Sequence, residues 1–250
     1  MTRIIGRLDV KGRRLIKGIQ YEGVRVIGDA LDYARKYYAS GIDELVYIDA
    51  VASLYGRPSM DELLKDTVEE VFVPVTAGGG VNTVDDVRSL LSSGADKVAI
   101  NTGAIRNPSL ISEIADRFGS QCVVISIQAK QTDTKKWEAY VECGREKTGI
   151  DVIEWARKVE ELGAGEILLT AIDKDGTYRG GGGDIPLVRQ VSEFANIPVI
   201  ASGGIGSSED VSKLIDAGYA DALAIGKALH FERLDMVSIR QAIKNTKRGG

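Results

Sequence analysis

The chain is poor in the residues that cross-link a fold or bind a metal ion. Its 250 residues include two cysteines, Cys122 and Cys143, and one histidine. Neither cysteine stands in a CxxC motif, so the sequence indicates no disulfide framework and no zinc site. We therefore expect a protein of a reducing compartment, the cytoplasm, that uses no metal ion and no cofactor.

The sequence also lacks long apolar runs and an excess of basic charge. No apolar run approaches the ~18 residues of a membrane-spanning helix, and the first residues, MTRIIGRLDVKG, do not resemble a signal peptide. Acidic residues number 36 and basic residues 32, which gives a net charge of −4. A chain with this charge has no electrostatic footprint for a polyanion. We expect a soluble protein with neither membranes nor nucleic acids among its partners.

What the sequence does contain is an internal repeat. Residues 74–105 (PVTAGGGVNTVDDVRSLLSSGADKVAINTGAI) and 198–229 (PVIASGGIGSSEDVSKLIDAGYADALAIGKAL) align with one extra residue near Tyr219. Each copy reads as an apolar strand, a Gly-Gly turn, a helix with acidic residues in its first turn, and a second apolar strand. Because the copies lie half a chain apart, the pattern indicates a duplicated parallel fold.

Eight short apolar segments that read as buried strands alternate with segments of helical periodicity. The helices start on capping residues such as Asp29 and Ser207 and often end at glycine. Eight such units predict an α/β fold, a single (β/α)8 TIM barrel over residues 1–250 made of two half-barrels. A doubly wound open sheet is the alternative. The expected strands are RIIGRLDV (3–10), ELVYIDAV (44–51), VFVPVTAGG (71–79), KVAINTG (97–103), CVVISIQAK (122–130), EILLTAID (166–173), IPVIASGG (197–204) and ADALAIG (220–226).

Three connecting segments stand out by length or composition. Residues 11–28 and 130–149 form long loops after the first and fifth strands, half a chain apart. The second loop contains KWEAYVECG, whose alternation predicts a small β-hairpin. Four glycines in a row, 180–183, follow the sixth strand, and we expect them to form a mobile lid.

Glycines that end two equivalent strands of the repeat indicate anion sites. Each Gly-Gly turn leads into a helix whose free N–H groups can accept an anion, and a further strand ends beside it. One such pair also fits a simple tight turn, but its placement in both halves predicts two opposed phosphate sites. The residues of this pattern are Gly79, Gly80, Asn101 and Thr102 in one copy and Gly203, Gly204, Gly226 and Lys227 in the other.

Polar residues at the C-terminal ends of strands carry the chemistry of such barrels. Asp9 ends the first expected strand between Lys11 and Lys17, so its carboxylate has cations nearby that can hold a substrate anion. Asp49 ends the second strand, and we expect it to tie strands together inside the barrel. His230 is expected to pack at the start of a helix rather than to serve catalysis.

Several segments carry a family resemblance, in order and spacing. They are RLDVKG, GDALDYARKYY, GIDELVYID, GADKVAINT, NPSLISEIADRFGSQCVV, GAGEILLTAIDKDGT, IPVIASGG and ALHF. Over essentially the whole chain they resemble the HisF family, the cyclase subunits of imidazole glycerol phosphate synthase. The phosphoribosyl isomerases of the same pathway share the duplicated barrel but lack GAGEILLTAIDKDGT in this form.

The resemblance implies a carbon–nitrogen lyase that works with a separate glutaminase chain. The glutaminase docks on the N-terminal face of the barrel, and the barrel carries its ammonia to a phosphorylated or diphosphorylated small molecule. Asp9, with Lys17 beside it, matches one aspartate of the family's acid/base pair. The residues matched to phosphate binding are Gly80, Asn101 and Thr102 for one phosphate and Asp175, Gly176, Gly204 and Gly226 for the other. The residues matched to the charged ring at the ammonia entrance are Arg3, Glu44, Lys97 and Glu166. The alternative is a solvated ring of salt bridges with no role in docking.

Two departures from the family pattern concern the reaction itself. The family has its second catalytic aspartate on the fifth strand, where this chain has Gln128. An amide cannot transfer a proton near neutral pH, and the loss of one acid/base group costs ~10²–10⁴ in rate. Arg7, two residues before Asp9 on the same inward face, replaces a small residue. Such a guanidinium needs a partner, which Asp9, Asp49 or a bound anion can supply, and it narrows an ammonia path along the barrel axis.

Three functions fit this pattern. The first, which we favour, is a HisF-like paralogue that delivers ammonia to another substrate, as in the formation of acetamidino sugars of surface polysaccharides. Alternatively, the chain is a genuine cyclase of histidine biosynthesis. The third alternative is a non-catalytic barrel that activates a glutaminase.

Overall fold

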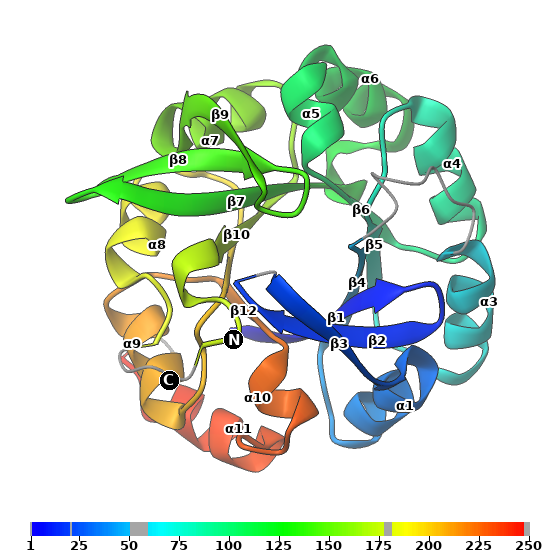
Figure 1. Cartoon of the computed structure of the whole chain (residues 1–250), viewed down its shortest axis with the longest axis vertical. Coiled ribbons are helices and arrows are strands. Elements are labelled where there is room, and N and C mark those ends of the chain that lie inside the picture. The colour runs from blue at the N-terminus through cyan, green and yellow to red at the C-terminus, as the bar shows by residue number, and fades with distance from the viewer. Residues whose placement is uncertain (1, 21, 51–59, 178–181, 248–250) are drawn as a thin grey trace.

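Eight parallel strands close into a barrel that is surrounded by helices (Figure 1). The structure is a computed structural model and describes residues 2–20, 22–50, 60–177 and 182–247. Around the barrel the strands run in the order β1 (Arg3–Lys11), β4 (Glu44–Asp49), β5 (Val75–Gly78), β6 (Lys97–Ile100), β7 (Val123–Asp133), β10 (Glu166–Ala171), β11 (Val199–Ser202) and β12 (Ala222–Ile225). Because β7 pairs with β10 and β12 pairs with β1, the ring has no free edge. The predicted barrel is confirmed, and the open-sheet alternative was wrong.

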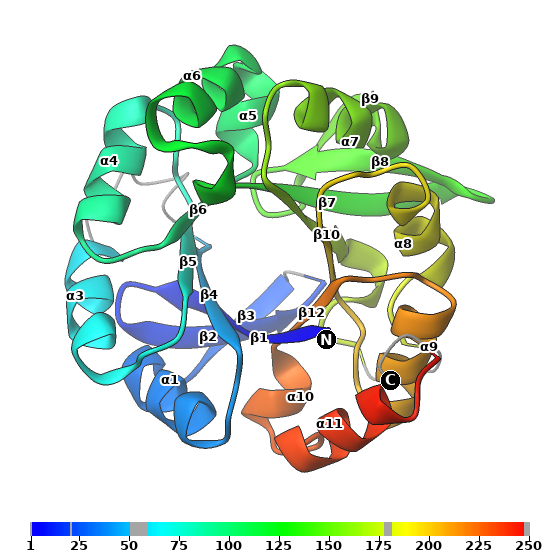
Figure 2. The same cartoon turned by 180° about the vertical axis from the view of Figure 1, so that it is seen from behind.

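Helices cover the outside of this ring, as the view from behind also shows (Figure 2). Their apolar faces pack on the outward side chains of the strands in one continuous core. They are α1 (Ala30–Ala39), α3 (Met60–Glu70), α4 (Val84–Ser92), α5 (Thr102–Arg106), α6 (Ser109–Phe118), α7 (Val152–Glu161), α8 (Ile185–Ser192), α9 (Ser208–Asp216), α10 (Lys227–His230) and α11 (Met236–Lys244), with 3₁₀ turns at Ser120–Cys122 and Ile172–Lys174. In the described part of the chain, none of the helices is both long and apolar enough to cross a membrane.

Both long loops are β-structure that extends the barrel strands at one end. The second loop forms the expected hairpin, with β8 (Lys136–Val141) on β7 and β9 (Glu146–Asp151) on β8. The first, expected to be a loop, is a hairpin too, because β2 (Arg14–Ile19) pairs with β1 and β3 (Glu22–Asp29) pairs with β2. The halves therefore match here as well, and Figure 1 shows both hairpins on the face where the strands end. Of the expected glycine lid, Gly180 and Gly181 lie outside the described residues.

The duplication extends to individual hydrogen bonds. The Thr83 hydroxyl and the Asp86 carboxylate form a capping box at the start of α4, and Ser207 and Asp210 form the same box at the start of α9. These contacts confirm the two-fold internal repeat predicted from the sequence. They also correct it, because the N–H groups at each helix start are not all free for an anion. The Thr83 and Ser207 hydroxyls accept from the N–H groups of Asp86 and Asp210, whose carboxylates accept from the N–H groups of Thr83 and Ser207.

Inward side chains fill the barrel in layers, as the two-residue period of strands requires. An apolar cluster lies inside the barrel between its two ends, and we call it the apolar layer; it consists of Ile5, Val46, Ile48, Ala99, Val124, Leu168, Ile200, Ala222 and Ala224. Two residues further along β1, β10 and β11 the inward positions are polar, at Arg7, Thr170 and Ser202. The polar chemistry therefore lies on the C-terminal side of the apolar layer.

Candidate functional site

The residues predicted to bind phosphate divide between two pockets at the C-terminal mouth of the barrel. The first is formed by Gly79, Gly80, Asn101 and Thr102 together with Ser126 and Gln128. The second is formed by Asp175, Gly176, Gly203, Gly204, Gly226 and Lys227 together with Arg7 and Ser202. A third pocket has Asp9, Lys17 and Asp175 in its wall and meets the first at Cys143. The structure thus brings together the groups that the repeat predicted.

Equivalent glycines make the turns of the first two pockets. Gly79 has φ +108°, and a β-carbon built on it lies 2.3 Å from the carbonyl oxygen of Asp49. Gly203 has φ +92°, and its β-carbon would lie 2.5 Å from the carbonyl oxygen of Ala171. Both the backbone conformation and the close approach exclude a side chain here. The Gly-Gly pairs are therefore required by the strand ends, whatever binds beside them.

Side-chain contacts hold the other residues of the first pocket in place. The Asn101 amide donates to the carbonyl oxygens of Ser126 and Tyr140, at 2.9 and 3.1 Å. The Thr102 hydroxyl accepts from the backbone N–H of Glu142 at 3.2 Å. These bonds join β6 to the β7–β8 hairpin, so they shape the pocket wall rather than point freely into it.

In the second pocket the charged residues are already paired with protein groups. The Lys227 ammonium donates to the carbonyl oxygen of Gly176 at 2.6 Å. The Asp175 carboxylate accepts from the Lys17 ammonium at 3.0 Å, so it neutralises a cation instead of contacting an anion. Of the predicted phosphate residues of this pocket, Gly204 and Gly226 contribute backbone and Lys227 contributes positive charge.

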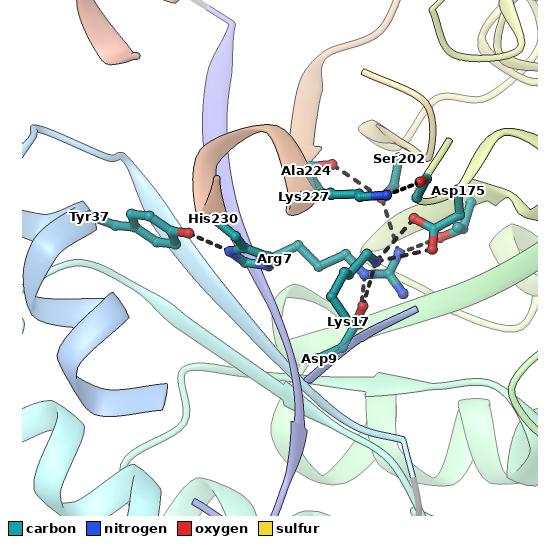
Figure 3. Close-up of polar contacts among 11 residues, drawn as sticks. Arg7, Asp9, Lys17, Tyr37, Asp175, Ser202, Ala224, Lys227 and His230 are labelled. Atoms are coloured by element: carbon teal, nitrogen blue, oxygen red, sulfur yellow. Dashed lines mark hydrogen bonds and ion pairs between the residues drawn. The ribbon is translucent and has the colours of Figure 1, made fainter. Parts of the chain in front are cut away.

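Four charged side chains form a buried network between β1, the β2–β3 hairpin and the segment after β10 (Figure 3). Asp9 accepts from the Arg7 Nε atom at 3.0 Å and from the Lys17 ammonium at 2.8 Å. Lys17 also bridges to Asp175, and each of the four residues is less than a tenth exposed. Two positive and two negative groups balance, which is the condition for burying such a cluster.

This network sets the protonation of Asp9. Burial by itself raises the pKa of the Asp9 carboxyl, but the guanidinium of Arg7 and the ammonium of Lys17 hold that pKa well below its usual range. Burial likewise lowers the pKa of Lys17, and Asp175 and Asp9 more than reverse this, so its pKa lies above the usual value. Asp9 is therefore a carboxylate at neutral pH but a weak base in this arrangement.

Gln128 lies where the second acid/base group was expected. It is on β7, 4% exposed, in register with Thr170 of β10, and it forms part of the wall of the first pocket. Its Oε1 atom is buried without a hydrogen-bond partner among the described residues. An unpaired buried amide oxygen is costly, so the site suits a ligand that donates a hydrogen bond to it.

Asp49 and His230 were predicted to have structural roles. The structure places Asp49 at the end of β4, 3% exposed, where it lines the first pocket. For His230 the expected position was wrong, because this residue ends α10 instead of starting a helix. It does pack as expected, because its ring stacks on Tyr37 and its Nδ1 atom shares a hydrogen bond with the Tyr37 hydroxyl.

At the opposite end of the barrel the four predicted ring residues contact one another. Arg3 lies 2.5 Å from the Glu44 carboxylate and 3.0 Å from Glu166. Lys97 lies 3.2 Å from Glu44 and 3.1 Å from Glu166. The charges therefore alternate around a ring that closes the start of the barrel below the apolar layer.

Several residues of the site carried no isolated sequence signal. Thr170 and Ser202 bind the Arg7 guanidinium, and Cys143 lies between the first and third pockets. The signal that could have found the first two is a polar residue at an inward position of an apolar strand. Burial raises the pKa of the Cys143 thiol to about 11, so this thiol is not a nucleophile at neutral pH. Among the described residues, no three His, Cys, Asp or Glu side chains gather to hold a metal ion.

We predict that inorganic phosphate binds in the first two pockets. Crystals soaked in phosphate should show density beside Gly80 and Thr102 and beside Gly204 and Gly226, because the glycines of the repeat line both pockets and the second pocket adds Lys227. Density only at other places would contradict the prediction.

We also predict that His230 makes the fold acid-sensitive. Burial lowers its pKa to about 3, whereas the unfolded chain has the ordinary value of 6.5. The unfolded state therefore binds a proton first, and the stabilisation by neutral His230 is present above pH 6.5 and is lost as the pH falls toward 3. Between pH 7 and pH 5, His230→Gln should lose about 2 kcal/mol less unfolding free energy than the native chain. Urea unfolding at both values measures this, and parallel losses would contradict it.

Comparisons with known proteins agree with this geometry. A model of the histidine biosynthesis protein family matches residues 3–235. The imidazole glycerol phosphate synthase subunit HisF of Legionella pneumophila is 59% identical over 209 residues, which make up 84% of this chain and 98% of that protein. The match thus spans both halves of the barrel and all three pockets.

Proposed function

We propose a function from the premise that the chain belongs to the histidine biosynthesis protein family and, within it, to the HisF-type cyclase subunits of imidazole glycerol phosphate synthase. It is the synthase subunit of a glutamine amidotransferase. A separate glutaminase binds the N-terminal face of the barrel and supplies ammonia. The ammonia reacts at the opposite mouth, beside Asp9, with a phosphorylated small molecule held in the first two pockets.

The charged ring supports the place of the glutaminase. Arg3, Glu44, Lys97 and Glu166 alternate in sign, and Arg3 is 28% exposed, so the ring is both ordered and accessible from outside. Glu44 and Glu166 are buried and Arg3 is the most exposed of the four, so a partner that docks at this end of the barrel meets the cations of the ring first.

The acceptor we propose is not the histidine-pathway substrate but an amino sugar derivative that becomes an amidine. The observation that carries this proposal is the buried Gln128 amide with its unpaired oxygen, in the place of a carboxylic acid. Ring closure needs proton transfer on both sides of the new ring, whereas delivery of ammonia to one carbon needs fewer transfers. An amide oxygen can instead accept a hydrogen bond from the nitrogen of an amidine. The pathway is then surface polysaccharide biosynthesis rather than amino-acid biosynthesis.

A genuine histidine-pathway cyclase is the second candidate, and the 59% identity to the Legionella HisF subunit favours it. An assay of the native chain with the diphosphorylated histidine-pathway substrate and ammonium salt distinguishes the two candidate functions. The amidine function predicts no more than trace imidazole glycerol phosphate. Turnover at an ordinary enzymatic rate, ~1 s⁻¹ or more, would establish the cyclase instead.

We predict that the ring carries the signal to the glutaminase. In a pull-down, the native chain should bind its glutaminase at micromolar concentrations. Lys97→Ala and Glu166→Ala should change glutamine hydrolysis in the complex, because each leaves the ring with one charge in excess and removes two of its four contacts. Arg88→Ala, on the exposed surface of α4, is the matched control. No association of the native chain would refute the docking.

A further inference from the structure

Arg7 spans the interior of the barrel. It leaves β1 on the inward face and is 2% exposed. Its Nη1 atom donates to the Thr170 hydroxyl at 2.9 Å and to the Ser202 hydroxyl at 3.0 Å. In the ring of eight strands, β10 lies three strands from β1, with β11 and β12 between them. The side chain therefore reaches from β1 to residues of β10 and β11, and Figure 3 shows it extended toward Ser202.

The same side chain belongs to two places at once. On one side its Nε atom is 3.0 Å from the Asp9 carboxylate, the candidate base. On the other side it lines the second pocket, together with Gly204, Gly226 and Lys227. A planar guanidinium has donors on several edges and binds carboxylates and phosphates in the same way. An anion in the second pocket therefore offers the guanidinium a partner other than Asp9.

The charges around Arg7 allow this exchange. Asp9 is also bound by Lys17, which in turn is held by Asp175. When the guanidinium turns away, Asp9 keeps one cation, so no carboxylate is left buried and unpaired. The serine and threonine hydroxyls that bind Nη1 can rotate to accept or donate, so they tolerate either position.

We propose that Arg7 is an anion sensor: an anion bound in the second pocket draws the guanidinium from Asp9 and thereby turns Asp9 into a competent base. This deepens the proposed function and rests on it only in taking the second pocket as a phosphate site. Arg7 acts as a positioning residue, because it reaches the reacting groups through Asp9. As a consequence of this exchange, Asp9 is a weak base in the protein without substrate and becomes a stronger base only when the phosphorylated end of the substrate occupies the second pocket.

The first arm of the test follows phosphate itself. Inorganic phosphate is titrated by calorimetry into the native chain, Arg7→Met, Arg7→Lys and the surface control Arg88→Met. Arg7→Met should weaken one of the two phosphate sites by about 10-fold or more, because a charge-assisted bond is lost. Arg7→Lys should keep part of that affinity, and Arg88→Met should bind as the native chain does. Equal affinity in Arg7→Met and the native chain would overturn the proposal.

The second arm uses the native chain, so it holds even where Arg7→Met folds poorly. In a phosphate-soaked crystal the guanidinium should contact the anion and leave the Asp9 carboxylate. In solution, carbon-13 titration should show that phosphate raises the pKa of Asp9 in the native chain. Phosphate in the second pocket with the Arg7–Asp9 pair intact, or no phosphate there, would refute the sensor. Neither arm involves glutaminase or acceptor, so both can succeed while the proposed function fails.

Discussion

Asp9→Asn should lower the free energy of unfolding by ~3–5 kcal/mol, the usual cost of removing one partner from a buried ion pair. The variant leaves the balanced network with two cations, Arg7 and Lys17, and only Asp175 to neutralise them. An uncompensated charge in the interior is strongly unfavourable. Urea unfolding at pH 7 measures the loss, and the same variant should lack synthase activity because no base remains.

The matched control is the double variant Asp9→Asn with Arg7→Met. It removes one charge of each sign, so Lys17 and Asp175 remain as a neutral pair. Its unfolding free energy should lie above that of Asp9→Asn alone, although it carries one more substitution. If the double variant is the less stable of the two, charge balance does not govern this network.

The strands of the barrel could be predicted because each carries a continuous apolar run. β4 and β10 are buried at every position, and such runs are typical of strands covered on both faces. The internal repeat then fixed the number of units. The hairpin of β2 and β3 was missed for the opposite reason: no residue of β3 is buried, and Val24 and Val26 are exposed. A strand without a buried face gives no amphipathic signal.

Site residues could be predicted where the two-residue period of a strand determines which side chains face into the barrel. The two-residue period placed Arg7 and Asp9 on one inward face, and their contact confirms it. The far partners, Thr170 and Ser202, could not be assigned, because which strands face each other depends on closure of the ring. The helix N–H groups are less free than expected, because a glycine turn in sequence does not reveal that the N-cap hydroxyl and a carboxylate three residues later bind N–H groups at the helix start.

If the proposed amidine function holds, Gln128→Asp should raise the cyclase activity of the chain well above that of the native protein. It restores the second acid/base group, and such a group contributes ~10²–10⁴ in rate. At this position, 4% exposed, burial would raise the pKa of the new carboxyl toward neutrality, where it can both take and give a proton. Formation of imidazole glycerol phosphate from the diphosphorylated histidine-pathway substrate with ammonium salt measures the gain.

Arg7 decides how large that gain is. The guanidinium lies 3.0 Å from Asp9 and binds Thr170, which pairs in register with Gln128, so it should lower the pKa of both carboxyls and occupy space that the closing ring needs. Gln128→Asp combined with Arg7→Cys should therefore exceed Gln128→Asp alone, and Gln128→Asn, which keeps an amide, should gain nothing. If the native chain already turns over this substrate at an ordinary enzymatic rate, Gln128 is compatible with ring closure. The acceptor is then the histidine-pathway substrate, because the amide would not have removed the reaction that the family performs.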